Sequence, residues 1–250
     1  MVSVPKTFGE VLGQIADVEG WLTEDQARRL YDRARELRED AQLVEIGSFR
    51  GRSLIVLASA APAGVGIVSI DPYAGSDRGP QEIAPNQHLG DSDYCSCIDN
   101  LTRAGVADRV THFRKMSGDA LGDVNGGIDL LYIDGAHRFG PARRDIVAWG
   151  DRVADGGAML IHDSFSSIGV TLALLTSTFA GSPWRYQGRS GSLAEYRREP
   201  MSGRESIVNA LRQALQLVWF ARNVVIKGAL TLRLYPLTRL LGHRTRDWPY

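Results

Sequence analysis

The sequence predicts an α/β fold, a Rossmann-like, doubly wound and mainly parallel seven-stranded sheet that ends in an antiparallel C-terminal hairpin. From Leu43 onward, short apolar segments alternate with helical patterns, which is typical of βαβ units. A glycine turn follows the first of these segments at Gly47, and an acid, Asp71, ends the second. Two segments near the C-terminus flank Gly188 and Gly191 and predict the hairpin.

Two helices are expected before the sheet. Phe8 and Ile15 belong to an apolar series at helical spacing, and Thr23 with Gln26 forms a capping box ahead of a second helix. We expect residues 1–40 to form an N-terminal helical cap that covers either the sheet edge or the mouth of a ligand site.

The elements that follow alternate regularly. Strands are predicted where apolar runs of strand length end in polar residues, and helices where apolar residues recur at helical spacing. The predicted strands are 43–46, 66–70, 109–113, 128–133 and 157–162, followed by a hairpin of 184–187 and 192–197, and the predicted helices are 53–60, 92–103, 140–149 and 168–179.

A long irregular loop is predicted at residues 72–91, because glycines, prolines and polar residues interrupt the alternation there. Such a loop directly after a strand is either a lid over a ligand or a plain surface loop. Both interpretations are kept.

The turn after the first strand predicts a nucleotide-binding site. Gly47 lacks a Cβ and lets a ligand approach the backbone, while Gly51 opens the next helix with exposed N–H groups. Glu45, at the end of the strand, can accept a hydrogen bond from a ligand amine. Asp71, on the next strand, can bind both hydroxyls of a ribose. The G-x-G-x-x-G spacing of dinucleotide-binding proteins is absent, which disfavours a nicotinamide dehydrogenase.

Acidic and histidine side chains follow the fourth and fifth predicted strands. Asp134 ends one strand, and His162 with Asp163 ends the next. Because neighbouring parallel strands end at the same edge, these three side chains are expected to converge on one divalent cation. Carboxylates suit Mg²⁺, whereas the imidazole of His162 is better suited to Mn²⁺ or a heavier metal. His137, three residues after Asp134, is the candidate general base.

Five motifs together resemble class I S-adenosylmethionine-dependent O-methyltransferases over residues 40–198. The similarity is greatest to the metal-dependent sugar O-methyltransferases of the macrocin and mycinamicin type, found in actinobacterial natural-product, polysaccharide and glycolipid pathways. The motifs are Val44–Ser53, Asp71 in Ile-Asp-Pro-Tyr, Met116–Ala120, Ile133–His137 and His162–Asp163.

The resemblance implies S-adenosyl-L-methionine (SAM) as the cofactor and residues 41–200 as the domain that binds it. It also implies Mg²⁺ or Mn²⁺ as a second cofactor. Related enzymes have Glu or Asp where this chain has His162. The implied roles are Glu45, Gly47, Ser48, Gly51 and Ser53 around the methionine part, Asp71 at the ribose, Ser117 and Gly118 at the adenine, Asp134 near both cofactor and metal, Asp134, His162 and Asp163 as metal ligands, and His137 as the base.

Composition places few further limits on the chain. The 250 residues carry no formal net charge, and Cys95 and Cys97 lie too close together for an ordinary disulfide. No basic start followed by an apolar core is present at the N-terminus, so a cytoplasmic location is expected. No nucleic-acid partner is indicated.

The last fifty residues, 201–250, differ in charge from the rest. They contain eight Lys and Arg against two acids, a net charge of +6, and an apolar series at helical spacing. We expect a basic amphipathic helical extension with too many polar residues to cross a bilayer. It packs on the core or on a second subunit, lies on an anionic membrane through residues 202–242, or guides an acidic acceptor.

The resulting expectation is a methyltransferase that uses a divalent metal and a His base to methylate a hydroxyl of a small-molecule or oligosaccharide acceptor. Two alternatives are kept. One is a catechol or phenol O-methyltransferase, and the other is a membrane-associated, non-catalytic module that retains the cofactor fold.

Overall fold

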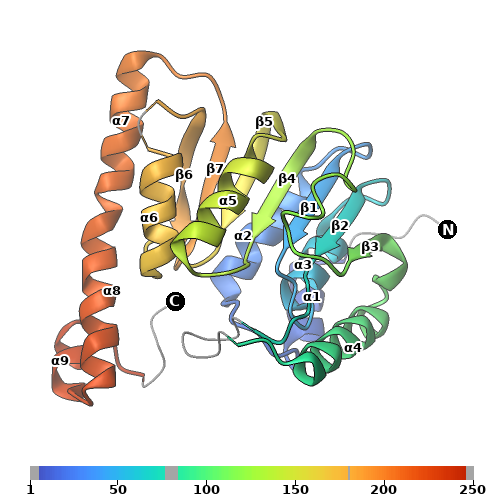
Figure 1. The fold of residues 1–250 in the computed structure, drawn as a ribbon, viewed down its shortest axis with the longest axis horizontal. Coiled ribbons are helices and arrows are strands. Elements are labelled where there is room, and N and C mark those ends of the chain that lie inside the picture. The colour runs from blue at the N-terminus through green and yellow to red at the C-terminus, as the bar shows by residue number, and fades with distance from the viewer. Residues whose placement is uncertain (1–5, 77–83, 180, 246–250) are drawn as a thin grey trace.

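A computed structural model of the protein describes residues 6–76, 84–179 and 181–245. Its centre is a seven-stranded sheet with the order β3-β2-β1-β4-β5-β7-β6 (Figure 1). The strands are β1 (Gln42–Ile46), β2 (Gly66–Ile70), β3 (Val110–Phe113), β4 (Ile128–Ile133), β5 (Val153–Ile161), β6 (Trp184–Ser190) and β7 (Leu193–Arg198).

The order of the strands reverses at β1. Strand β1 pairs in parallel with β2 on one side and with β4 on the other, and β4 pairs in parallel with β5. Strand β7 is antiparallel to both β5 and β6. This arrangement confirms the predicted doubly wound sheet with its antiparallel hairpin. In such sheets the crevice for ligands opens where the order reverses, at the carboxyl ends of the strands.

Helices cover both faces of the sheet (Figure 1). Because side chains alternate along a strand, Leu43 packs on one face with the first helices, and Val44 packs on the other with α5 and α6. The helices of the first face are α1 (Phe8–Ile15), α2 (Glu24–Arg35), α3 (Arg52–Ala60) and α4 (Gln87–Ala104), and those of the second are α5 (Phe139–Gly150) and α6 (Ile168–Ser177). A short 3₁₀ helix, Ala107–Arg109, precedes β3.

The two leading helices are present as predicted. At α2 the Thr23 hydroxyl accepts a hydrogen bond from the Gln26 N–H, and the Gln26 side chain accepts one from the Thr23 N–H. These two bonds satisfy backbone donors that a helix start leaves without partners. The capping box therefore begins α2 where the sequence indicates.

Three predicted boundaries were wrong by more than two residues. Strand β5 begins at Val153 rather than at 157, because Val153 already pairs with Ile128 of β4 before the register shifts. Helix α4 begins at Gln87 rather than at 92, because the Asn86 side chain accepts from the Leu89 N–H and caps the helix early. Strand β6 continues past Gly188 to Ser190 through a register shift next to Tyr186, so the hairpin turns at Gly191. Residues 77–83 of the predicted loop 72–91 lie outside the described residues, as do 1–5 of the cap and 246–250 of the extension.

The C-terminal extension forms a column of helices beside α6 and the hairpin (Figure 1). It consists of α7 (Gly203–Ala214), α8 (Gln216–Thr231) and α9 (Tyr235–Leu240). Over the described ranges, the chain contains no helix that combines the length and the apolar character needed to cross a bilayer.

Candidate active site at the ends of β1, β4 and β5

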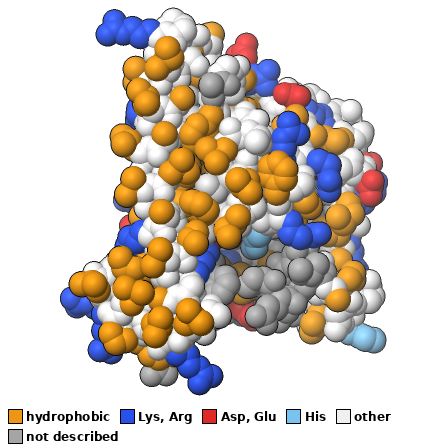
Figure 2. Space-filling model, turned by 60° about the vertical axis from the view of Figure 1, so that its left-hand side comes forward, with side chains coloured by type: hydrophobic (Ala, Val, Ile, Leu, Met, Phe, Trp, Pro, Cys, Tyr) orange, Lys and Arg blue, Asp and Glu red, His pale blue; other side chains and the backbone are white. Residues whose placement is uncertain are grey.

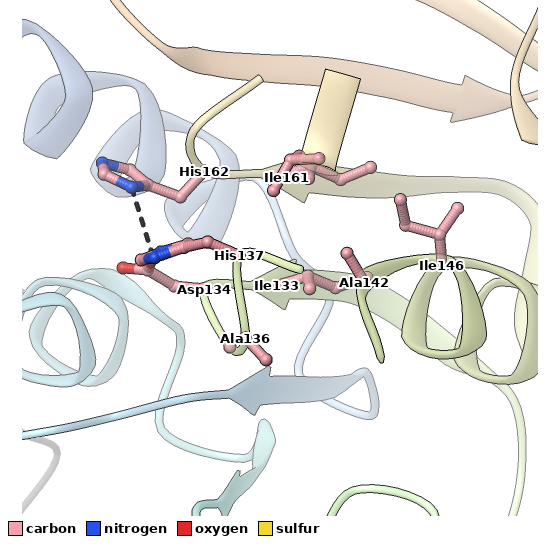
Figure 3. Close-up of a pocket in the computed structure, with 10 residues that line it drawn as sticks. Ile133, Asp134, Ala136, His137, Ala142, Ile146, Ile161 and His162 are labelled. Atoms are coloured by element: carbon pink, nitrogen blue, oxygen red, sulfur yellow. Dashed lines mark ion pairs between the residues drawn. The ribbon is translucent and has the colours of Figure 1, made fainter. Parts of the chain in front are cut away.

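Four titratable side chains meet where β4 and β5 end. His162 Nδ1 lies 3.2 Å from Asp134 Oδ1 and 3.8 Å from Asp163 Oδ2, and His137 Nε2 lies 2.8 Å from Asp163 Oδ2. Figure 3 shows His162 pointing from the end of β5 toward Asp134, with His137 beside Asp134. The structure therefore brings together the three candidate metal ligands and the candidate base. We call these four residues the acid–imidazole cluster.

The cluster combines buried and accessible groups. The side chains of His162 and Asp163 are almost fully buried, whereas those of Asp134 and His137 are 28% and 40% exposed. His137 and Asp134 are therefore accessible from solvent, and the buried Asp163 contacts His137.

The ionisation of the cluster follows from its pairing. Burial alone would raise the pKa of Asp163, but the hydrogen bond from His137 and the nearby imidazole of His162 hold it well below its usual value. Burial would likewise lower the pKa of His162, but Asp134 and Asp163 raise it well above 6.5. The pKa of His137 is also raised, because the bond to Asp163 outweighs its burial. Asp163 is therefore ionised, and it favours a proton on either imidazole.

Two buried atoms of the cluster lack a hydrogen-bond partner. They are His162 Nδ1, whose contact with Asp134 is close but poorly angled for a hydrogen bond, and Asp163 Oδ1. Unpaired buried polar atoms are costly and uncommon in folded proteins. The chemistry of the donors, two carboxylates and one imidazole, fits a divalent cation. As the side chains stand, however, no three His, Cys, Asp or Glu residues in the described ranges surround a common ion position.

Two further residues support the cluster and were missed by the sequence reasoning. The Tyr132 hydroxyl donates to Asp134 Oδ2 at 2.9 Å, and Gln26 Oε1 lies 3.4 Å from His162 Nε2. Tyr132 could have been found, because it precedes Asp134 by two residues and therefore shares its side of the strand. Gln26 could not, because it lies on α2 and was already assigned to a capping box.

The glycine turn lies directly against the cluster. Gly47 has φ +85°, and a Cβ added there would lie 2.2 Å from the carbonyl oxygen of Asp134. No side chain fits in that space, so the turn after β1 and the chain after β4 are in backbone contact. Gly51 also has a positive φ, but a Cβ there would meet Cys97 Sγ of α4 at 3.0 Å. The absence of a side chain at Gly51 therefore allows α4 to pack closely against the turn.

Glu45 lies beneath the turn and is completely buried. Its carboxylate accepts hydrogen bonds from the hydroxyls of Ser48 at 2.8 Å and Ser53 at 2.5 Å. Burial raises the pKa of Glu45 to about 8, against the opposing effect of the two serines. Ser48 also shares a 2.8 Å hydrogen bond with Ser69 of β2. Glu45, Ser48 and Ser53 thus form a closed polar network that shapes the turn from within.

Asp71 connects the end of β2 to the same turn. Its Oδ2 accepts from the backbone N–H groups of Ser48 at 2.9 Å and Phe49 at 3.0 Å, and its Oδ1 accepts from Tyr73 N–H at 2.7 Å. Asp71 therefore holds two consecutive residues of the turn by their backbone. It follows β2, the neighbour of β1, and a ribose acid is expected at the end of that strand.

The remaining two candidates lie in the turn after β3. The Ser117 hydroxyl donates to Asp145 Oδ1 of α5 at 2.5 Å, and Asp145 Oδ2 lies 3.5 Å from the Cβ position of Gly135. Ser117 is thereby connected to the loop that carries the cluster. Gly118 has open space around its Cβ position.

Comparison with known proteins identifies this architecture. Residues 44–164 match the family model of a methyltransferase domain. The O-methyltransferase from Bacillus cereus in complex with SAH is 16% identical (TM-score 0.52, covering 78% of this chain and 93% of that one), and TomG from Streptomyces achromogenes, an O-methyltransferase of tomaymycin synthesis in complex with SAM, is 17% identical (0.51, 80% and 92%). The O-methyltransferase NovP is 14% identical (0.57, 76% and 88%).

These identities establish a shared fold, and the matched domain supports a methyltransferase. The expected methyltransferase is thus supported by the matched domain, and the expected fold by the solved structures.

Proposed function

We propose that this methyltransferase-domain protein transfers the S-methyl group of SAM to a hydroxyl of a saccharide, either a small molecule or an oligosaccharide, with His137 as general base. The observation that carries the proposal is the His137–Asp163 pair, 2.8 Å long and partly open to solvent, beside the glycine turn at the reversal of strand order.

We place SAM at the turn because acidic residues and small residues meet there. We propose that Glu45, Gly47, Ser48, Gly51 and Ser53 shape the site of the methionine part and that Asp71 binds the ribose. Ser117 and Gly118 then lie at the adenine, and Asp134 lies between the cofactor and the acceptor. The backbone contact between Gly47 and Asp134 supports this placement.

The chemistry is a direct displacement, in which the acceptor oxygen forms a bond to the methyl carbon while the carbon–sulfur bond breaks. His137 Nδ1, the ring nitrogen that does not face Asp163, removes the hydroxyl proton, and Asp163 at Nε2 stabilises the imidazolium that results. A saturated sugar hydroxyl is a weak acid and needs such a base, whereas a phenol needs less help. The carboxylate partner of His137 therefore favours a saccharide acceptor.

We further propose that Asp134, His162 and Asp163 hold Mg²⁺ or Mn²⁺. A bound ion would supply Lewis acidity that makes a coordinated hydroxyl easier to deprotonate. The unpaired Nδ1 of His162 and Oδ1 of Asp163 support the proposal. The imidazoles that now face the carboxylates would have to shift or lose a proton when the ion binds.

The first test replaces the base. We expect His137→Ala to lower turnover at least about 100-fold while SAM binding, measured by calorimetry, stays unchanged. The exposed His88→Ala serves as the control. Turnover that survives in His137→Ala, or an equal loss of SAM affinity, would show that His137 is structural.

The second test addresses the acceptor and the metal together. Methyl transfer is screened over saccharides and catechols, in chelator and with added Mg²⁺ or Mn²⁺. We expect transfer to saccharides that a chelator abolishes and Asp163→Asn lowers. Transfer to catechols alone would replace the acceptor class, and full activity in chelator would remove the metal.

A further inference from the structure

Helix α7 is turned with its polar side inward. Asn209 and Gln213 are buried against the domain, whereas Ile207, Val208 and Leu211 are exposed. A helix on the surface of a globular domain normally does the opposite. The apolar side of α7 therefore faces away from the protein's own core.

Hydrogen bonds fix this orientation. The Asn209 side chain accepts from Tyr186 N–H at 2.8 Å and donates to the Trp184 carbonyl at 2.9 Å, both on β6. Gln213 donates to the carbonyl of Thr178 and accepts from its hydroxyl, both at 3.0 Å. Turning the helix over would leave these buried groups unpaired, which costs about 1–3 kcal/mol for each. The exposure of the apolar side is thus built into the packing.

The exposed apolar side continues through α8 and α9. From Ile207 to Val218 its members recur three or four residues apart, so they lie on one side of the helical column. Val218 is 73% exposed and Leu240 on α9 is 82% exposed. Figure 2 shows hydrophobic side chains along this column. We define the outer apolar face as Ile207, Leu211, Leu215, Val218, Leu232 and Leu240.

Basic side chains border this face. Arg204, Arg212, Arg233, Arg239 and Arg244 are all exposed. Figure 2 shows Lys and Arg at the ends of the column. The acid among residues 202–245 is Glu205, whose carboxylate accepts from Ser202 and pairs with Arg185 at 3.0 Å. The surface therefore combines an apolar stripe with excess positive charge.

We propose that the outer apolar face docks on an anionic lipid surface. A large exposed apolar patch marks an interaction site, and a helix with apolar and basic sides is suited to lie in a membrane interface. A second copy of this chain fits less well, because a twofold contact through this face would set arginines against arginines. None of the described helices is suited to cross the bilayer, so the contact is peripheral.

The test is flotation of the full chain with phosphatidylcholine vesicles, with and without added phosphatidylglycerol. We expect the protein to float with the anionic vesicles and to dissociate as salt is raised. Leu211→Gln combined with Val218→Gln is expected to weaken vesicle binding at least about tenfold. Leu89→Gln, an exposed leucine on α4, is the matched control.

Charge variants distinguish electrostatic attraction to the vesicle surface from insertion of the apolar side chains. Arg204→Gln with Arg212→Gln should weaken binding to anionic vesicles about tenfold or more, while Arg35→Gln with Arg38→Gln should not. Equal losses in both pairs, or equal binding to neutral and anionic vesicles, would overturn the proposal. So would a dimer in light scattering that Leu211→Gln dissociates in the absence of lipid, because the occupant would then be a second copy.

Discussion

Helices α2 and α7 begin alike and pack in opposite ways. Each has twelve residues and starts with a capping box, Thr23 with Gln26 in α2 and Ser202 with Glu205 in α7. Yet α2 buries Leu30 and other apolar residues in the core, while α7 buries two amides and exposes its aliphatic side chains.

The difference shows what an amphipathic pattern can and cannot predict. Helical spacing indicates that a segment is a helix with two unlike sides. It does not indicate which side packs against the domain, because that depends on whether the sheet presents apolar side chains or polar backbone groups to the helix. The sheet offers α2 apolar side chains, and it offers α7 the backbone groups of β6, a strand at the sheet edge.

The largest expected effect is a difference in stability between two leucine variants, one in each helix. Leu30→Ala should lower the free energy of unfolding by about 3 kcal/mol, because it leaves a cavity in the core. Leu211→Ala should change it by less than about 0.5 kcal/mol, because Leu211 is already in solvent. Urea unfolding of both variants measures the contrast. Similar losses in the two would mean that the apolar side of α7 is covered within the protein.

The second prediction concerns the charge state of a buried polar group. Glu45 keeps its proton in the folded protein up to about pH 8, whereas in the unfolded chain it ionises near 4.5. Stability should therefore fall as pH rises from about 5 to about 8, on the order of 2 kcal/mol. Glu45→Gln should remove this fall in urea unfolding at several pH values. The buried amides of α7 add no such dependence, so an unchanged fall in Glu45→Gln would assign it to another group.

The third prediction tests the inward amides. Asn209→Ala should cost about 1–2 kcal/mol, because the Tyr186 N–H and the Trp184 carbonyl both lose their partner. Gln187→Ala, which removes an exposed amide on β6, should be close to neutral in the same denaturation assay. A neutral Asn209→Ala would show that α7 is not held by these bonds.

The smallest expected change in stability concerns the capping box, which the two helices share. Thr23→Ala and Ser202→Ala should each cost about 1 kcal/mol, since each removes a capping box of the same kind. Thermal unfolding of both measures the loss. If only one variant loses stability, the contribution of the capping box would differ between the two helices, as their packing does.

Much of the fold could be predicted because its central strands are buried on both faces. Such strands are continuous apolar runs in the sequence, and β1, β2 and β4 lie within one residue of their predicted bounds. The start of α4 was missed because residues 87–91 are largely polar and the cap depends on one side chain, that of Asn86. The bulge in β6 was missed because it depends on pairing with β7.

The site could be predicted only as far as strand order allows. Asp134 and Asp163 end strands that the alternation makes neighbours, so their proximity follows from topology. Their partners do not, since Gln26 reaches His162 from an element 136 residues away in sequence. The pairing of His137 with Asp163 likewise requires coordinates. The catalytic, cofactor and metal roles of these residues stay predictions.

The contact between Gly47 and Asp134 has a consequence for how much variation the protein tolerates. Any larger residue at 47 would separate the loops after β1 and β4, and with them the proposed donor side and acceptor side of the reaction. Alignment of the methyl donor with the acceptor thus depends on the absence of a side chain at Gly47. A variant at position 47 that is stabilised by changes elsewhere could therefore still be inactive, because those changes would not restore the contact between the two loops.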